Sequence, residues 1–332
     1  MKHAITKLII TLTTPLVILS CNNSNNNTLK KNITGRAGEM VVVMSKDMWS
    51  SAPGDSLRNI VARPQLSLPQ SEPIFDLFNV PHNAFKDIFK TTRNIIMTNI
   101  SATVEKPEVA FKSDVWAKSQ AVVEISAKNI TEFIKLIGEN KERITNYFLN
   151  AERNRLISGY KKTYNHVILD TLQHKFNLSM YCQPGYKIAV DKDNFLWVRY
   201  DTPNITQGIF VYSVKYTTDS IFTADYLVRI RDKFLRKYIR YQKNDAYMTT
   251  EKRVDQVINT IKHNGNYAVE MRGLWKTVND FMGGPYVLIA ELDVPNQRVV
   301  IADGFVYAPN ENKRNLERQV EATLFTMKFN DQ

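Results

Sequence analysis

Cysteine is nearly absent from this chain of 332 residues, which contains only two. No framework of disulfides can be built from them, so a buried apolar core must hold the fold, and a chain of this length can supply one. Cys182 lies in the apolar stretch LSMYCQPG, where a buried structural thiol is expected. Cys21 differs, because it closes the apolar run at the start of the chain.

Motifs for metal binding and for nucleophilic catalysis are also missing. The chain contains no H-E-x-x-H, no C-x-x-C, no G-x-S-x-G and no G-x-x-x-x-G-K. His166 and His174 are eight residues apart, so on one helix they would be separated by about 12 Å and could not share an ion. The sequence therefore predicts no metal site and no cofactor, and it identifies no catalytic residue by motif.

The chain has no apolar run long enough to span a bilayer near its start. Residues 8–19 form an apolar run of twelve residues, which is shorter than the roughly 20 needed to span but typical of a signal peptide. Lys2 and Lys7 precede it, and Ile-Leu-Ser-Cys at its end matches the site at which bacterial lipoproteins are cleaved and acylated. We predict a lipoprotein signal peptide over residues 1–20 and a palmitate-bearing lipid anchor at Cys21. An ordinary secretory signal with an incidental cysteine is the alternative.

Residues 21–36 are rich in asparagine and poor in apolar residues. Such a segment cannot bury enough surface to become ordered, so we predict a flexible tether. The formal net charge is +11, and removal of Lys2 and Lys7 with the signal would lower it to +9. In the cell envelope, a basic protein would favour anionic lipid or glycan phosphates over nucleic acid. We expect the protein to be anchored in the outer membrane and to face the periplasm.

The pattern of apolar residues predicts an α+β fold in two halves, residues 37–165 and 166–332. Each half runs strand, helix, several strands, helix, which favours an internal duplication with mainly antiparallel sheets and helices on one face of each sheet. Asn129 and Glu132 predict a capping box at the start of the long helix that ends the first half. Gly138 and Gly159 are the expected weak points of that helical region.

Two long segments carry a resemblance to a known family. They are RGLWKTVNDFMGGPYV (272–287) and DGFVYAPNENKRNLERQVEATLFTM (303–327), supported by LPQSEPIF, TTRNIIM and NFLWVRY. With these segments the chain resembles the Bacteroidetes envelope lipoprotein family of unknown function DUF4837, over essentially the whole mature chain. The resemblance implies an envelope lipoprotein and provides no reaction, cofactor or catalytic residue. The segment YIRYQKNDAYMTTE departs from the Gly/Pro-rich turn that the family usually has there.

The densest polar cluster in the second half is the candidate ligand-binding region. It consists of Glu270, Arg272, Trp275, Asn279, Asp280 and Asp303. Two carboxylates that converge on an arginine can perform general acid–base catalysis, or can bind a sugar or a peptide group. The alternative is structural: Arg272 pairs with Glu270 or Asp280, and Trp275 packs in the core.

A basic stripe marks the helix predicted over residues 223–241. Arg229, Lys233, Arg236 and Arg240 are spaced by four, three and four residues, which places them on one face. This stripe predicts a surface that binds anionic lipid or glycan, while a solvated helix face is the alternative. No aromatic signature of RNA binding accompanies it, so we expect no nucleic acid partner.

The sequence therefore favours a lipid-anchored envelope protein that acts by binding, as an accessory or assembly component for an envelope protein or glycan. One alternative is an enzyme, a hydrolase of envelope polymers that uses Asp280 or Asp303, with Arg272 positioning the substrate. Another is a structural lipoprotein without a defined ligand. The hydrolase hypothesis requires that Arg272, Asp280 and Asp303 meet in one pocket.

Overall fold

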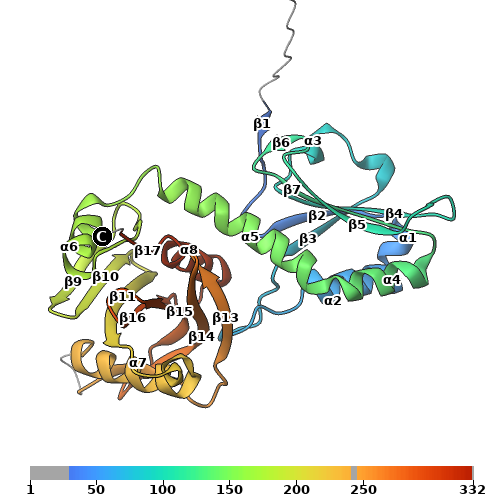
Figure 1. Ribbon diagram of the computed structural model, residues 1–332. Helices are drawn as coiled ribbons and strands as arrows, with labels where there is room; N and C mark the ends of the chain where they lie inside the picture. Colours follow the sequence, from blue (N-terminus) through green and yellow to red (C-terminus); the bar gives the residue numbers. More distant parts are fainter. Residues whose placement is uncertain (1–29, 241–244, 331–332) are drawn as a thin grey trace, which may run out of the picture.

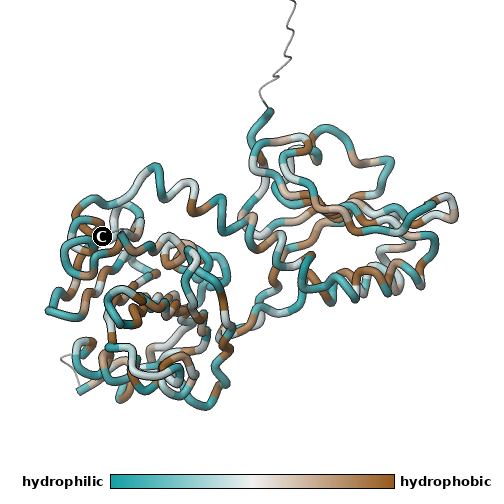
Figure 2. The backbone as a smooth tube through the Cα atoms, in the orientation of Figure 1, coloured by the Kyte–Doolittle hydropathy of each residue, from teal (hydrophilic) through white to brown (hydrophobic). Residues whose placement is uncertain are grey.

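The computed structural model describes residues 30–240 and 245–330 (Figure 1). The predicted signal peptide, Cys21 and the tether up to residue 29 lie outside the described residues. The described chain is a mixed α+β protein, as predicted, and its two halves are built around separate sheets (Figure 1). Figure 2 shows hydrophobic segments concentrated in the sheet of each half.

The N-terminal half contains a five-stranded sheet of order β3-β2-β4-β7-β5. Four strands are parallel and β5 runs antiparallel to β7. Parallel strands are covered on both faces, which explains their continuous apolar runs. The strands are β2 (Glu39–Val43), β3 (Asp76–Val80), β4 (Asn94–Ile100), β5 (Glu108–Ser113) and β7 (Ala121–Ala127).

Helices cover one face of this sheet around a core that includes Phe75, Phe133 and Phe148. The other face carries a smaller cluster, in which Phe85 and Trp116 pack against the strands. The helices of this half are α1 (Lys46–Trp49), α2 (Ala52–Val61), the 3₁₀ helix η1 (His82–Ala84), α3 (Asp87–Lys90), α4 (Ile130–Glu139) and α5 (Lys141–Tyr160).

The predicted helix start at Asn129 is confirmed, although the Glu132 side chain bonds to the N–H before Asn129 rather than to that of Asn129 itself. The Asn129 side chain accepts a hydrogen bond from the Glu132 N–H at 2.9 Å, and the Glu132 carboxylate accepts one from the Lys128 N–H at 2.7 Å. The helical region breaks after Glu139, next to Gly138, and α5 ends at Tyr160, next to Gly159. The local sequence therefore determines where these helices start and stop.

The last part of the predicted tether is ordered, so the prediction of flexibility is wrong for residues 30–36. β1 (Lys31–Asn32) pairs in parallel with β6 (Ala117–Lys118). The Thr34 N–H donates to the Thr91 carbonyl at 2.8 Å, and the Arg93 N–H donates to the Thr34 carbonyl at 3.1 Å. Backbone hydrogen bonds, which do not depend on apolar side chains, hold this segment.

The C-terminal half is an antiparallel sheet of eight strands, with the order β12-β14-β15-β16-β11-β10-β9 and with β13 beside β14. A hairpin joins the strands of residues 187–201, and the last three long strands form a meander. The strands are β9 (Lys187–Lys192), β10 (Phe195–Asp201), β11 (Thr206–Lys215), β12 (Tyr247–Thr250), β13 (Val257–His263), β14 (Asn266–Val278), β15 (Gly283–Asp293) and β16 (Arg298–Tyr307).

Helices pack on both faces of this second sheet. On one face Leu172 and Val320 contact a core that includes Ile289, and on the other face Leu227 belongs to a core that includes Leu288. The first face carries α6 (His166–Phe176) and α8 (Arg314–Leu324), and the second carries the 3₁₀ helix η2 (Asp219–Phe222) and α7 (Ala224–Tyr238). A small pair of strands, β8 (Leu178–Ser179) and β17 (Lys328–Phe329), completes this half.

Two details of the predicted fold are wrong. The halves are not duplicates, because the first sheet is mostly parallel and the second is antiparallel. Parallel strands need long crossovers, whereas antiparallel strands are joined by hairpins, so the two connectivities cannot be superposed. Helices also cover both faces of the second sheet rather than one.

Candidate functional site

The structure separates the predicted ligand-binding residues onto two faces of the C-terminal sheet. On one face, Arg272 of β14 lies 3.0 Å from the carboxylate of Glu321 in α8. On the opposite face, Asp303 of β16 lies 2.8 Å from Arg231 in α7, and both side chains are fully buried. The backbone of the sheet therefore lies between Arg272 and Asp303.

Of the other members of the predicted cluster, Glu270 pairs with Arg272, as the structural alternative expected, but Asp280 and Trp275 do not meet it. Asp280 lies in the exposed turn between β14 and β15, where its side chain accepts a hydrogen bond from the Phe281 N–H at 2.7 Å. Asn279, in the same turn, has a left-handed backbone conformation with φ 61°. Trp275 is buried and its indole N–H donates to the Val306 carbonyl at 3.1 Å. The convergence that the hydrolase hypothesis requires is therefore not formed by these residues.

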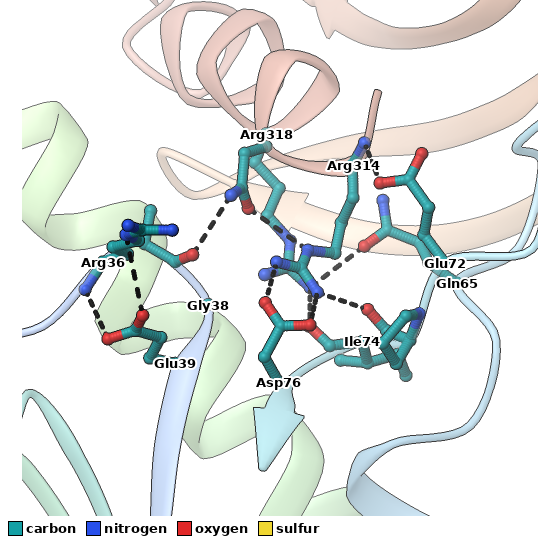
Figure 3. A network of polar contacts seen from close by, with 12 residues as sticks. Arg36, Gly38, Glu39, Gln65, Glu72, Ile74, Asp76, Arg314 and Arg318 are labelled. Atoms are coloured by element: carbon teal, nitrogen blue, oxygen red, sulfur yellow. Dashed lines mark hydrogen bonds and ion pairs between the residues drawn. The ribbon is translucent and has the colours of Figure 1, made fainter. Parts of the chain in front are cut away.

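The junction between the two halves is built on α8, which belongs to the C-terminal half. Figure 3 shows side chains of the N-terminal half around the start of this helix. The Glu72 carboxylate accepts hydrogen bonds from the backbone N–H groups of Lys313 and Arg314, at 2.7 and 3.0 Å. The Arg314 guanidinium in turn donates to both oxygens of Asp76, at 2.7 and 3.2 Å. The N-terminal half thus supplies the cap of a helix that belongs to the other half.

A chain of ion pairs continues along α8 across the junction. Glu321 lies between Arg153 of α5, at 2.6 Å, and Arg272 of β14, at 3.0 Å. Arg272 also pairs with Glu270 and lies 3.5 Å from Glu317. Burial opposes ionisation of Glu321, but Arg272 and Arg153 outweigh it and lower its pKa to about 2. At Glu317 burial is the stronger effect, and it raises the pKa to about 7 although Arg272 opposes it.

A cavity of about 210 Å³ opens beside these ion pairs, at the junction. Asn146, Leu149 and Arg153 form one wall from a single face of α5, because they are spaced by three and four residues. The other lining residues come from the loop after α2, from Ile74 and from Glu152 of α5 in the N-terminal half, and from β13, β14 and α8 in the C-terminal half. These remaining lining residues are Arg63, Pro64, Gln65, Leu66, Ile74, Glu152, Val257, Asn259, Glu270, Arg272, Arg318 and Glu321.

Two amide side chains at this cavity are open to a ligand. Asn146 and Asn259 are exposed, and neither side chain forms a hydrogen bond within the described part of the chain. Asn259 lies directly across from Glu270 in the pairing of β13 with β14. Each amide offers donors and an acceptor. The cavity therefore presents free polar groups beside several paired charges and beside Arg318, whose Nε and Nη1 have no partner among the described residues.

The basic stripe predicted from the sequence lies on the exposed face of α7. Arg229, Lys233 and Arg236 are exposed there, and Lys237, which the sequence analysis did not include, is exposed beside them. Arg240 is exposed next to this face, but it lies beyond the end of α7 at Tyr238, so the predicted helix does not reach it. None of the five forms an ion pair with a carboxylate within residues 30–240 and 245–330. Asp232, the carboxylate of α7 that lies among these residues, pairs with Lys252 at 3.2 Å instead.

The described residues contain no group of three or more His, Cys, Asp or Glu side chains arranged to hold a metal ion. In the same part of the chain, we find no helix with both the length and the apolar character needed to cross a bilayer.

Sequence reasoning missed Arg153, Glu317 and Glu321 at the junction and Arg231 in the core. Arg231 had a readable signal, because it lies four residues after Leu227 and four before Leu235 on the apolar side of α7. A single arginine at such a position must find a buried partner. The three junction residues had no comparable signal, because a charged helix face normally points to solvent.

The fold and the junction define a two-domain α+β protein, and family comparisons give the same division. Residues 165–326 match the domain of unknown function DUF4837, and residues 33–161 match the domain of unknown function DUF8532. The C-terminal half therefore matches the DUF4837 family model. The sequence resemblance is confirmed for that half, while the N-terminal half matches a different family.

Known structures resemble this chain only distantly. The match to a point mutant of the protein Mog1 covers 46% of this chain and 90% of the Mog1 chain, with 10% identity and a TM-score of 0.30. The Ran-binding protein Mog1p of Saccharomyces cerevisiae gives the same coverage and TM-score, with 9% identity. The match to the lipid transfer and protein localization domain of human StarD13 covers 49% of this chain and 94% of that domain, with 9% identity and a TM-score of 0.23. No curated protein matches the chain.

Proposed function

We propose that this chain is a lipid-anchored cell-envelope protein that acts by binding, as an accessory or assembly component that holds part of an envelope glycan. This proposal rests on the cavity between the two halves. Residues of both domains line this cavity, and two of them carry exposed side-chain amides. Ligand sites occur preferentially at domain interfaces, where a few polar groups converge in an otherwise apolar pocket.

The chemistry of the cavity favours a neutral, hydroxyl-rich ligand. Glu270 and Glu321 are both already paired with Arg272. A charged ligand would therefore have to compete with these ion pairs. Sugar hydroxyls both donate and accept, which suits the amides of Asn146 and Asn259. A volume of about 210 Å³ is below the roughly 300 Å³ of the smallest drug-sized pockets, and it fits one sugar ring better than a long oligosaccharide.

Replacing Asn259 with alanine should weaken binding of an envelope sugar by up to about tenfold, because one hydrogen bond contributes about 0.5 to 1.5 kcal/mol. Asn146→Ala should have a similar effect. Titration of the full chain with N-acetylated amino sugars and soluble cell-wall fragments, followed by NMR or calorimetry, measures this. Asn154→Ala is the matched control, because Asn154 is an exposed residue of the same helix that does not line this cavity. Saturable binding to none of these sugars, or an equal loss in the control, would count against the glycan proposal.

The anchoring part of the proposal rests on Cys21 and the sequence pattern before it. The described chain begins at the edge of the N-terminal half, beside β1 (Figure 1), so an anchor before residue 30 is compatible with the fold. Two acyl chains or more give stable attachment, since each buried methylene contributes about 0.8 kcal/mol.

Cells grown with labelled palmitate should incorporate the label into this protein, and Cys21→Ser should abolish the label and move the protein out of the membrane fraction. Cys182→Ser is the matched control, because this second cysteine is buried in the fold. A labelled Cys21→Ser variant, or unlabelled wild-type protein, would contradict the anchor.

A further inference from the structure

The exposed face of α7 is a concentration of unpaired positive charge. Arg229, Lys233, Arg236, Lys237 and Arg240 are all exposed and form no ion pair with a carboxylate in the described chain. Elsewhere the exposed arginines commonly have partners, such as Arg199 with Asp201 and Arg253 with Glu251. Asp232 also lies on this face but is paired with Lys252. The face therefore has a net positive charge, which attracts a surface of the opposite sign.

Aromatic rings hold several of these cations in place. Arg229 lies over the ring of Tyr226, with 5.5 Å between the guanidinium carbon and the ring centroid, and Arg236 lies over Tyr247 at 5.2 Å. The ammonium of Lys237 is 4.7 Å from the ring centroid of Tyr238. Such contacts reduce the conformational freedom that binding would otherwise remove. Tyrosine is also enriched where proteins meet the headgroup region of a bilayer.

A fully exposed aromatic residue lies next to this face. Phe281, at the tip between β14 and β15, is completely accessible to solvent. The register of the sheet places this tip close to α7, because Val278 pairs with Tyr247, the residue over whose ring Arg236 lies. Met282, the next residue in the turn, packs into the same core as Tyr238 of α7. The tip that carries Phe281 therefore lies next to the C-terminal end of α7, where Arg236 and Tyr247 meet.

We propose that the basic face of α7 and the Phe281 tip form a docking surface for a lipid bilayer with anionic phosphate headgroups. The cations complement the phosphates, and Phe281 enters the boundary between headgroups and acyl chains. The exposed phenylalanine favours a bilayer over a soluble phosphate polymer, because a hydrated polymer offers no apolar phase in which to bury it.

This surface is distinct from the predicted anchor and from the junction cavity. β1, where the described chain begins, and α7 lie at opposite ends of the molecule (Figure 1). The cavity is lined from the other face of the sheet, by α8 and α5. The inference therefore goes beyond the proposed function and depends on neither the glycan nor the lipid anchor.

The test is flotation with vesicles of phosphatidylcholine, with and without phosphatidylglycerol, using the full chain with Cys21→Ser so that no acyl anchor forms. The protein should prefer the anionic vesicles at low salt and lose that preference at high salt. Because each basic residue near an anionic surface strengthens binding by about fivefold, Lys233→Glu with Lys237→Glu should weaken binding to anionic vesicles by at least about 25-fold. The apolar run at residues 8–19 is present in every variant, so any vesicle binding that it contributes is the same background in all of them.

Two matched controls test whether binding depends on this surface, rather than on the net charge of the protein or on any exposed phenylalanine. Lys161→Glu with Lys162→Glu makes the same change in net charge at two exposed positions of the other half and should keep wild-type binding. Phe281→Ala should reduce binding about tenfold, with little dependence on salt, whereas Phe78→Ala, at a half-exposed position of the N-terminal sheet, should not.

Equal flotation with neutral and anionic vesicles would overturn the proposal. So would equal losses in the two lysine variants, full binding by Phe281→Ala, or binding to soluble polyphosphate without binding to vesicles.

Discussion

Replacing Asp303 with alanine should lower the free energy of unfolding by about 3 to 5 kcal/mol, because it leaves a buried charge without its partner. Asp303 and Arg231 are 2.8 Å apart and both side chains are fully buried. The Arg231 guanidinium also lies over the ring of Tyr286, 3.9 Å from its centroid, so it cannot reach solvent without disrupting this core. Urea unfolding followed by circular dichroism measures the change.

The double variant Arg231→Met with Asp303→Leu is the matched control for this prediction. Replacing both charges by apolar groups of similar size removes the cost of burying them, and such replacements are often neutral or stabilising. The double variant should therefore recover most of the stability that Asp303→Ala loses. A loss below about 1 kcal/mol in Asp303→Ala would show that water or another group compensates Arg231.

Replacing Glu317 with glutamine should stabilise the protein at about pH 8 and leave its stability nearly unchanged at about pH 4. Burial raises the pKa of Glu317 from 4.5 to about 7. The stability gained from its bound proton is fully present below about pH 4.5 and is lost as the pH rises through about 7. A shift of this size corresponds to about 3 kcal/mol. Glutamine stays neutral and can still accept the hydrogen bond that the Gln65 amide donates at 2.6 Å.

Glu321→Gln should show the opposite dependence on pH. Arg272 and Arg153 outweigh the burial of Glu321 and lower its pKa to about 2, so its carboxylate stabilises the fold above about pH 4.5. That contribution is lost as the pH falls through about 2, and the variant should be less stable than wild type at neutral pH. Urea unfolding of both variants across this pH range measures the two effects. Parallel pH profiles for wild type and Glu317→Gln would contradict the assignment.

Local patterns in the sequence predicted those features that depend on interactions between residues close together in the chain. The helix start at Asn129 and the break after Gly138 follow from side-chain hydrogen bonding and backbone propensity, which act within a few residues. The strand Glu108–Ser113 was missed, since EVAFKS is short and half of it is polar. The sequence also could not show that the halves are not duplicates, because strand and helix patterns do not specify whether neighbouring strands run parallel or antiparallel.

The candidate site was harder to predict, because it depends on contacts between distant segments. Glu270 and Arg272 were correctly placed on one face of a strand, but the face occupied by Asp303 depends on the register of three strands. A shift of one residue would have moved Asp303 to the side of Arg272. The junction cavity forms only when α5 and α8 meet, and no local pattern encodes that contact.

Because residues of the N-terminal half cap α8, recombination cannot easily replace that half with an unrelated domain. Glu72 and Asp76 satisfy the first turn of α8, and Arg153 neutralises Glu321 near its end. An unrelated domain fused in place of residues 33–161 would leave the first N–H groups of α8 and the Arg314 guanidinium without these partners, and Glu321 with Arg272 alone, unless it supplied matching groups. The two domains are therefore not exchangeable modules, and a successful swap would have to carry the junction with it.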